Sequence, residues 1–238
     1  MPPITFAHRG ARAQHPENTI RAFRHALEAG ARGLETDAWT AADGVAVLVH
    51  DPFLKVRRAG VVPTRLRVAT STSTALARYD VPTLGSLYDE LGSDYELSID
   101  LKDPEVADAV LETARERGDP GRLWLCSPSR RRLRELREKT RGVHLVHSTF
   151  RRHLPEPLER HAADLARHGI EAMNLHHSEW TRGLVELFHR FDVRAFAWDV
   201  QEVRHLHAML RIGIDAVYCD HVERMVGTVA EWSTNPNA

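Results

Sequence analysis

The stretch at residues 33–38 carries two carboxylates that could bind a metal ion together. Glu35 and Asp37 alternate with Leu34 and Thr36 in this short run. Because the side chains of a strand alternate between its two faces, both carboxylates lie on one face, with Cα atoms about 7 Å apart. This spacing lets them hold one ion between them. Taken alone, the pair is also compatible with an exposed strand edge.

A second apolar run, at residues 95–102, places polar groups on one face in the same way. Ser98, Asp100 and Lys102 alternate with three apolar residues, Leu97, Ile99 and Leu101. A carboxylate is costly to bury unless it is paired or bound to metal. Asp100 therefore either forms an internal ion pair with Lys102 or joins the first two carboxylates as a third ligand. Three carboxylates with no sulfur ligand beside them favour a hard cation, Mg²⁺ or Ca²⁺.

Two histidines stand at the ends of apolar runs. His8, followed by Arg9, ends the first run of the chain, and His50, followed by Asp51, ends a later one. Two imidazoles titrate near neutrality, so one can act as a general base and the other as a general acid. The planar guanidinium of Arg9 suits a phosphate group. Although His8 alone is compatible with a structural histidine, the whole set indicates phosphoryl-ester cleavage.

The elements that must position these residues alternate regularly along the chain. Apolar runs of strand length are followed by segments of helical periodicity, which implies a parallel sheet. Eight such units predict a closed (β/α)₈ barrel of the α/β class, a TIM barrel, whose strand ends carry the active site. An open doubly wound sheet is the alternative, but the first loop lacks its Gly-rich phosphate motif. The predicted barrel strands are 4–8, 33–38, 95–102, 122–127, 143–148, 171–175, 193–199 and 215–220.

One segment departs from this alternation and predicts a small insertion after the second barrel strand. The run 45–50 follows a turn, 41–44, whose sequence resembles a hairpin connection. Residues 52–80 have weak periodicity and many Thr, Ser and Arg residues, so we predict a loop or small excursion there. Because no linker or internal repeat is found elsewhere, we expect residues 1–238 to form a single domain.

Composition argues against several other classes of protein. The 238 residues have a formal net charge of −1, so we expect no nucleic-acid partner. The basic run 130–141 is interpreted as a solvated helix face. Cys126 and Cys219 are too few for a disulfide framework and are expected to be buried thiols. With no stretch long enough for a membrane span and no leader pattern before the first strand, we expect a cytoplasmic protein.

With these residues identified, the sequence resembles the glycerophosphodiester phosphodiesterase family. The most specific part of the resemblance is an ordered set of short motifs in the first half of the chain, although it extends from end to end. The matching segments are AHRG (7–10), PENT (16–19), LETD (34–37), DGVAVLVHD (43–51), VPTL (81–84), LSIDLK (97–102), AFAWDV (195–200) and GIDAVYCD (213–220).

The resemblance implies a TIM barrel that hydrolyses glycerophosphodiesters, as small-molecule substrates, to glycerol 3-phosphate and an alcohol. In the mechanism proposed for this family, the glycerol 2-hydroxyl attacks phosphorus to give a cyclic phosphate, which water then opens. The implied cofactor is a divalent cation, Mg²⁺ or Ca²⁺. By similarity, Glu35, Asp37 and Asp100 match metal ligands, His8 and His50 match the acid/base pair, and Arg9 and Lys102 match groups that contact the phosphate.

The chain departs from the family pattern in four places, one of which is a short segment after residues 50–54. Asp100 stands where the family usually has Glu, so a bound ion must lie closer or gain a water. Residues 198–201 read Trp-Asp-Val-Gln where the family usually has Trp-Thr-x-Asn, and the usual proline after Asp220 is absent. Trp198 either stacks on substrate at the barrel mouth or packs against the helices. These differences affect the expected leaving-group pocket more than the expected chemistry.

Two other functions are compatible with the same barrel. A lysophospholipase D-type phosphodiesterase would need an apolar groove for an acyl chain, and residues 52–66 offer some apolar surface for one. A barrel that binds phosphodiesters without catalysis is the other alternative. The presence of both histidines and all three carboxylates argues against this last function.

Overall fold

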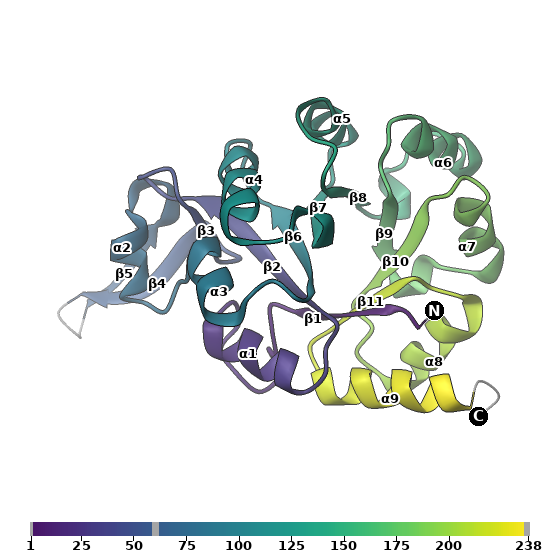
Figure 1. The fold of residues 1–238 in the computed structure, drawn as a ribbon, viewed down its shortest axis with the longest axis horizontal. Coiled ribbons are helices and arrows are strands. Elements are labelled where there is room, and N and C mark those ends of the chain that lie inside the picture. The colour runs from purple at the N-terminus through teal and green to yellow at the C-terminus, as the bar shows by residue number, and fades with distance from the viewer. Residues whose placement is uncertain (1, 59–61, 236–238) are drawn as a thin grey trace.

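The parallel strands of the chain close into a barrel. The computed structural model describes residues 2–58 and 62–235. The first strand pairs with both the second and the last, so eight parallel strands form a complete ring and the TIM-barrel prediction is confirmed (Figure 1). Around the ring the strands are β1 (Ile4–His8), β2 (Gly33–Thr40), β6 (Glu96–Leu101), β7 (Leu123–Ser127), β8 (His144–Ser148), β9 (Ala172–His176), β10 (Arg194–Trp198) and β11 (Ala216–Cys219).

Helices follow the barrel strands and cover the outside of the ring (Figure 1). The first helix begins after Thr19, whose hydroxyl oxygen accepts a hydrogen bond from Ala22 N. Gly30, just beyond its end, adopts a φ of 92°, as a helix-ending glycine does. The helices are α1 (Ile20–Glu28), α3 (Leu84–Leu91), α4 (Val106–Arg117), α5 (Arg130–Lys139), α6 (Leu158–Arg167), α7 (Arg182–His189), α8 (Val203–Ile212) and α9 (Val222–Thr234).

The predicted insertion after β2 is present but is more regular than expected. β3 (Ala46–Leu48) pairs antiparallel with β2, as the turn sequence indicates. Of the loop or small excursion predicted at 52–80, the excursion is confirmed: β4 (Phe53–Arg58) and β5 (Val62–Arg67) form a separate antiparallel hairpin, followed by the short helix α2 (Ser73–Ala77). This two-stranded sheet buries little, so its sequence carries many charged residues and only a weak apolar alternation.

The two faces of the barrel strands divide the apolar core into two layers. Inside the ring, the rings of Phe6 and Tyr218 stack with centroids 4.8 Å apart, and Trp124 and Phe196 pack beside them. The outer layer, between strands and helices, includes the three residues predicted to face the helices, Leu97, Ile99 and Leu101. The predicted alternation of β6 is therefore confirmed, and its polar face points into the barrel.

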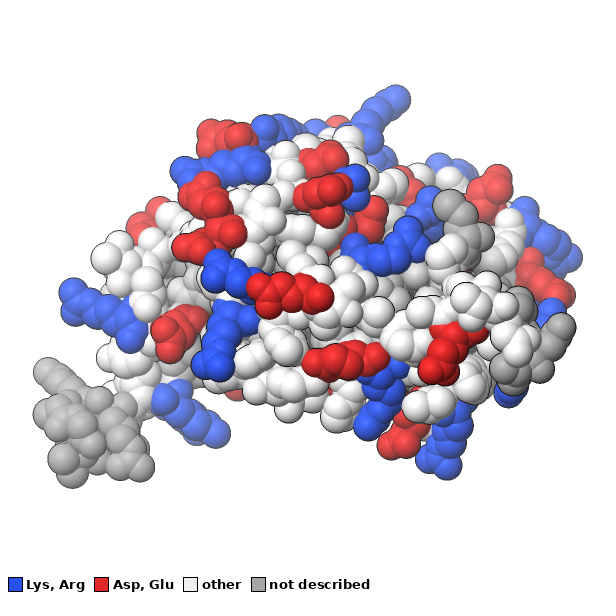
Figure 2. Space-filling model, turned by 60° about the horizontal axis from the view of Figure 1, so that its bottom comes forward, with Lys and Arg blue, Asp and Glu red and all other residues white. Residues whose placement is uncertain are grey.

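The outer surface carries charges of both signs. Figure 2 shows basic and acidic side chains interspersed over one face, in keeping with the net charge of −1. Cys126 and Cys219 are free and buried, as expected. Within the described ranges, no helix combines the length and apolar character that crossing a bilayer requires.

Gly33 leaves room for the aromatic residues that fill the barrel. A Cβ atom at this position would lie 2.6 Å from Cδ1 of Phe6, and Phe6 is fully buried. Overpacking of this kind costs about 1–3 kcal/mol. We therefore expect Gly33→Ala to lower the free energy of unfolding by about that amount, measured by urea denaturation.

Gly227, in the middle of α9, provides a matched control. A Cβ atom there would meet nothing within 4 Å. Because alanine favours helix over glycine by about 1 kcal/mol, Gly227→Ala is expected to stabilise the protein slightly. Equal destabilisation by both substitutions would contradict the packing argument for Gly33.

Candidate active site

Polar side chains gather at the carboxyl ends of the barrel strands. His8 is the last residue of β1, Asp100 lies near the end of β6, and Trp198 is the last residue of β10. All parallel strands end on the same face of a barrel, so residues distant in sequence meet there. They surround a cavity of about 440 Å³, lined by His8, Arg9, Arg12, Glu35, Asp100, Cys126, Ser148, Asn174, Trp198, Asp199, Gln201, Tyr218 and Asp220.

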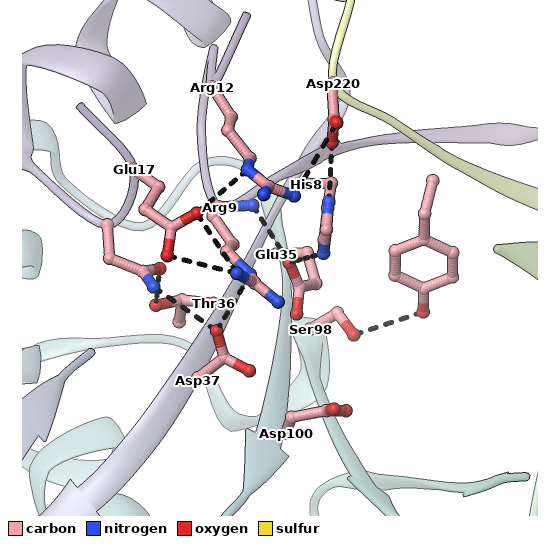
Figure 3. A network of polar contacts seen from close by, with 12 residues as sticks. His8, Arg9, Arg12, Glu17, Glu35, Thr36, Asp37, Ser98, Asp100 and Asp220 are labelled. Atoms are coloured by element: carbon pink, nitrogen blue, oxygen red, sulfur yellow. Dashed lines mark hydrogen bonds and ion pairs between the residues drawn. The ribbon is translucent and has the colours of Figure 1, made fainter. Parts of the chain in front are cut away.

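Glu35, Asp37 and Asp100 form a compact carboxylate group (Figure 3). Asp37 pairs in register with Asp100 across β2 and β6, so both project into the barrel side by side. One oxygen from each of the three carboxylates lies within 4.8 Å of the other two. Glu35 and Asp37 are only 5% and 1% exposed. All the donors are oxygens, which is the donor set that Mg²⁺ and Ca²⁺ prefer.

Burial and mutual repulsion oppose the ionisation of this group. Burial raises the pKa of Glu35 to about 8, and the charges of Asp37 and Asp100 add to the effect. Burial also raises the pKa of Asp100, with a further contribution from Asp37. A divalent cation would offset both effects by placing positive charge among the oxygens. The residues therefore fit a hard divalent cation in donor type and in electrostatics.

Asp37 is the member of the group that ionises most readily. Burial opposes its charge, but Lys102 and Arg9 outweigh burial and hold the pKa of Asp37 below its ordinary value. Lys102 Nζ lies 2.7 Å from Asp37 Oδ1 and 3.3 Å from Asp100 Oδ2. The ion pair between Asp100 and Lys102 thus forms within the carboxylate group, so the two alternatives that the sequence left open coexist.

His8 is held between two carboxylates. Its Nδ1 lies 2.6 Å from Asp220 Oδ1, and its Nε2 lies 3.8 Å from Glu35 Oε2. Burial alone would lower the pKa of His8, but Glu35 and Asp220 outweigh burial, so that this pKa is raised. With Nδ1 engaged by Asp220, Nε2 is the nitrogen left to exchange a proton.

The backbone after β1 explains the His-Arg-Gly sequence. Arg9 and Gly10 adopt φ angles of 53° and 78°, the region that favours glycine. A Cβ atom on Gly10 would lie 2.8 Å from Cβ of Ala22 on α1, so the turn needs glycine here. The turn directs the Arg9 N–H to Glu35 Oε2, 2.9 Å away. The Arg9 guanidinium donates to Glu17 at 3.0 Å, which holds it at the cavity wall.

Asn18, which is buried beside the carboxylate group, is a residue that the sequence interpretation did not assign to the site. Its Nδ2 donates to Asp37 Oδ2 at 3.3 Å, and its Oδ1 accepts from Thr36 Oγ1 at 2.7 Å. Asn18 is the third residue of the Pro-Glu-Asn-Thr motif and has a φ of 54°. Its side chain lies against β2. The motif therefore orients Asp37, a role that the local sequence, polar on both sides of Asn18, did not indicate.

Asp220 is the second residue that the sequence interpretation missed, as the partner of His8. It follows β11, so it ends an apolar run in the same way as His8 does. Arg12 Nη1 lies 3.6 Å from its other oxygen, and Gln201 Oε1 accepts a hydrogen bond from its backbone N at 2.9 Å. Its position at a strand end was a usable signal, but the strand pairing that brings it to His8 was not visible locally.

His50 lies beside the carboxylate group and not among the residues of the cavity wall. Its Nδ1 lies 2.7 Å from Asp51 Oδ1, and its backbone oxygen accepts a hydrogen bond from Trp39 Nε1 at 3.1 Å. The charge of His50 contributes to the lowered pKa of Asp37. His8, at the end of β1, therefore faces Glu35, whereas His50, in the bend after β3, is near enough to Asp37 to affect its pKa.

Trp198 stands at the barrel mouth. Its ring meets those of His176 and Phe150 edge-on, with centroids 4.6 and 5.0 Å away. It lines the cavity and packs on the apolar cluster inside the barrel. Of the two placements that the sequence left open, the structure thus has Trp198 at the mouth and not against the outer helices.

A family model and two relatives of similar length indicate the family of this chain. The model of the Glycerophosphoryl diester phosphodiesterase family matches residues 8–224. A glycerophosphodiester phosphodiesterase from Caldanaerobacter subterraneus subsp. tengcongensis is 26% identical, over 96% of this chain and 98% of its own length. A probable glycerophosphodiester phosphodiesterase 2 from Mycobacterium tuberculosis is 29% identical, over 92% of this chain and 88% of its own.

Solved structures agree with these sequence matches. A glycerophosphodiester phosphodiesterase from Thermotoga maritima is 27% identical and has a TM-score of 0.81, covering 94% of this chain and 97% of its own. A phosphodiesterase from Oleispira antarctica, solved with the product sn-glycerol-3-phosphate, is 18% identical with a TM-score of 0.81, covering 96% and 97%, and so resembles this chain in fold. Because the family match spans nearly the whole barrel, the chain belongs to the glycerophosphoryl diester phosphodiesterase family, and it is a phosphoric diester hydrolase.

Proposed function

We propose that this enzyme hydrolyses glycerophosphodiesters to glycerol 3-phosphate and an alcohol, with a divalent cation and the pair His8 and His50 as acid and base. One observation carries the proposal. His8 Nε2 lies 3.8 Å from Glu35 Oε2, so a proton-exchanging nitrogen adjoins a group of carboxylates suited to a hard cation. A phosphodiester in the cavity would meet both at once.

Glu35, Asp37 and Asp100 would hold the cation, Mg²⁺ or Ca²⁺. Bound there, it would supply positive charge to the phosphoryl oxygens, on which negative charge grows in the transition state. Lys102, 2.7 Å from Asp37, adds a further compact positive charge at the same place. Asp37 then remains ionised throughout, because Lys102 and Arg9 already favour its charged form.

His8 and His50 would move the protons. The raised pKa of His8 favours its protonated form, which suits the acid that gives a proton from Nε2 to the departing alcohol. His50 would take the proton of the attacking glycerol 2-hydroxyl. Asp220, 2.6 Å from Nδ1, would keep the His8 ring oriented, as a carboxylate does for a catalytic imidazole.

Arg9, Lys102 and Trp198 would bind the substrate. The Oleispira antarctica phosphodiesterase binds sn-glycerol-3-phosphate, the product expected of this reaction. Arg9 and Lys102 supply positive charge for the phosphate, and Trp198 supplies an apolar wall at the mouth. Because most of the cavity lining is charged or polar, a small water-soluble diester suits it better than a lysophospholipid with its acyl chain.

Removal of the divalent cation should abolish turnover. We expect EDTA to stop the release of choline and glycerol 3-phosphate from glycerophosphocholine, and Mg²⁺ or Ca²⁺ to restore it, because the carboxylates need a hard cation to act together. Asp100→Asn should raise the cation concentration needed, whereas Asp108→Asn, at an exposed position on α4, should not. Full activity in a sample verified to be free of metal would overturn the ligand assignment.

Loss of either histidine should reduce turnover sharply. We expect His8→Ala and His50→Ala each to lower kcat by about 10²-fold or more, the usual scale for a positioned acid or base. The pH–rate profile of the unmodified enzyme should be bell-shaped, because one imidazole must be neutral while the other is protonated. Near-normal kcat in either variant at saturating substrate would remove that histidine from the mechanism.

Asp220→Asn tests whether the acidic or the alkaline limb of the pH profile of kcat reflects the ionisation of His8. The carboxylate of Asp220 helps to raise the pKa of His8, so its removal should lower that pKa. If His8 is the acid, the alkaline limb of the kcat profile moves to lower pH. Movement of the acidic limb instead would assign the role of base to His8.

Lys102 should not be replaceable by arginine. It is one of three lysines among 32 basic residues, and its ammonium fits between Asp37 and Asp100. A guanidinium is a larger, planar group, so we expect Lys102→Arg to lose much of kcat and to approach Lys102→Ala. Lys139→Arg, on the exposed ion pair with Asp108, is the matched control. Wild-type kcat in Lys102→Arg would show that charge alone suffices.

A further inference from the structure

A second group of metal-ligating side chains lies on the same rim as the active site. His176 ends β9, His177 follows it, and Asp199 comes directly after β10. Since β9 and β10 are paired neighbours, the three residues leave adjacent strand ends. In the strand order these two strands lie across the barrel from β2 and β6, which carry the carboxylate group. The two groups therefore occupy opposite sides of one mouth.

The three residues present donor atoms within reach of one ion. One donor atom from each lies within 4.8 Å of the other two. His176 Nε2 lies 3.3 Å from Asp199 Oδ2, and the rings of His176 and His177 have centroids 4.4 Å apart. Zinc binds nitrogen and oxygen ligands at about 2.0–2.2 Å, so donors with this spacing can share one zinc ion after small side-chain rotations.

Neighbouring groups orient two of these donors. His176 Nδ1 accepts a hydrogen bond from Ser178 N at 3.3 Å and lies 2.7 Å from Ser178 Oγ, so Ser178 fixes the ring and Nε2 is the nitrogen that faces Asp199. Gln201 Nε2 donates to Asp199 Oδ1 at 3.2 Å, which leaves Oδ2 directed to His176. Outer contacts of this kind fix the tautomer and orientation of metal ligands.

An independent sign of a missing ligand comes from α8. The ring of His205 stacks on that of His177, with centroids 4.2 Å apart and an interplanar angle of 27°. In the described part of the chain, His205 Nδ1 is buried and has no hydrogen-bond partner. A buried polar atom without a partner commonly marks the place of a water or an ion. The unpartnered nitrogen of His205 therefore lies on a ring stacked directly on His177, beside the three candidate ligands.

We propose that His176, His177 and Asp199 bind a divalent metal ion of the zinc class, separate from the hard-cation site. Two imidazole nitrogens and one carboxylate are a donor set typical of zinc, whereas an all-oxygen set favours Mg²⁺ or Ca²⁺. Three protein ligands leave one position of a tetrahedral ion open. Because Asp199 lines the active-site cavity, that position is open to small ligands from the mouth. The proposed hydrolysis uses none of these three residues.

Zinc titration of the whole enzyme tests the site. The protein is stripped with a chelator, dialysed and titrated with Zn²⁺ by calorimetry in saturating Mg²⁺, which occupies the hard-cation site. We expect one Zn²⁺ per chain. His177→Ala and Asp199→Asn should each weaken zinc binding at least about 10- to 100-fold, the loss that even outer-shell changes cause. His177→Gln, which keeps a side chain of similar size, repeats the test should His177→Ala fail to fold.

His207→Ala is the matched control. His207 lies on α8 like His205, but its ring lies against Trp232, so this variant should bind zinc as the unmodified protein does. Asp100→Asn is the converse control, since it alters the carboxylate group alone. It should weaken Mg²⁺-dependent hydrolysis and leave the zinc titration unchanged.

Three results would overturn the proposal. They are an absence of bound zinc, unchanged zinc affinity in the His177 and Asp199 variants, and loss of zinc binding in Asp100→Asn, which would place the zinc among the carboxylates. Failure of the proposed hydrolysis would leave the titration unaffected, because zinc binding is measured without substrate. The two proposals can therefore fail separately.

Discussion

The repulsion among Glu35, Asp37 and Asp100 is the constraint on which the active site depends. Three carboxylates in a largely buried group are unfavourable unless positive charge surrounds them. Lys102 and Arg9 supply part of that charge at Asp37, whereas burial keeps the pKa values of Glu35 and Asp100 raised. The electrostatics of the group are thus the physical basis for the divalent cation that we propose and for the basic side chains beside it.

The barrel makes this group possible because, in β2 and β6, one inward residue belongs to the packed interior and the next inward residue is a carboxylate at the mouth. In β2 the inward residue Gly33 makes room for the ring of Phe6, and Glu35 is the next inward residue. In β6, Ser98 hydrogen-bonds within the barrel, and Asp100 is the next. The closely packed side chains inside the barrel end where the charged mouth begins. The carboxylates lie against this packed layer, which limits their movement.

Gln201 connects the two sides of the mouth. Its side-chain Nε2 donates to Asp199 Oδ1, and its side-chain Oε1 accepts from the backbone N of Asp220. The carboxylate of Asp220 in turn contacts His8. Gln201 stands where the family usually has asparagine. Two departures from the family pattern, at residues 198–201 and after Asp220, therefore lie at the rim that carries the proposed zinc ligands, whereas Asp100 lies in the carboxylate group across the mouth.

The sequence by itself determined the alternation of strands and helices and the inward face of β2 and β6, because both follow from short-range periodicity. It also determined the candidate residues that end strands, since a charged side chain after an apolar run is visible locally. Only the tertiary structure decided which of them meet. His8 and Asp220 are 212 positions apart, and His176 reaches Asp199 only because β9 and β10 become neighbours. Barrel closure sets these contacts, and no local pattern encodes strand neighbours or the angle at which a side chain crosses the mouth.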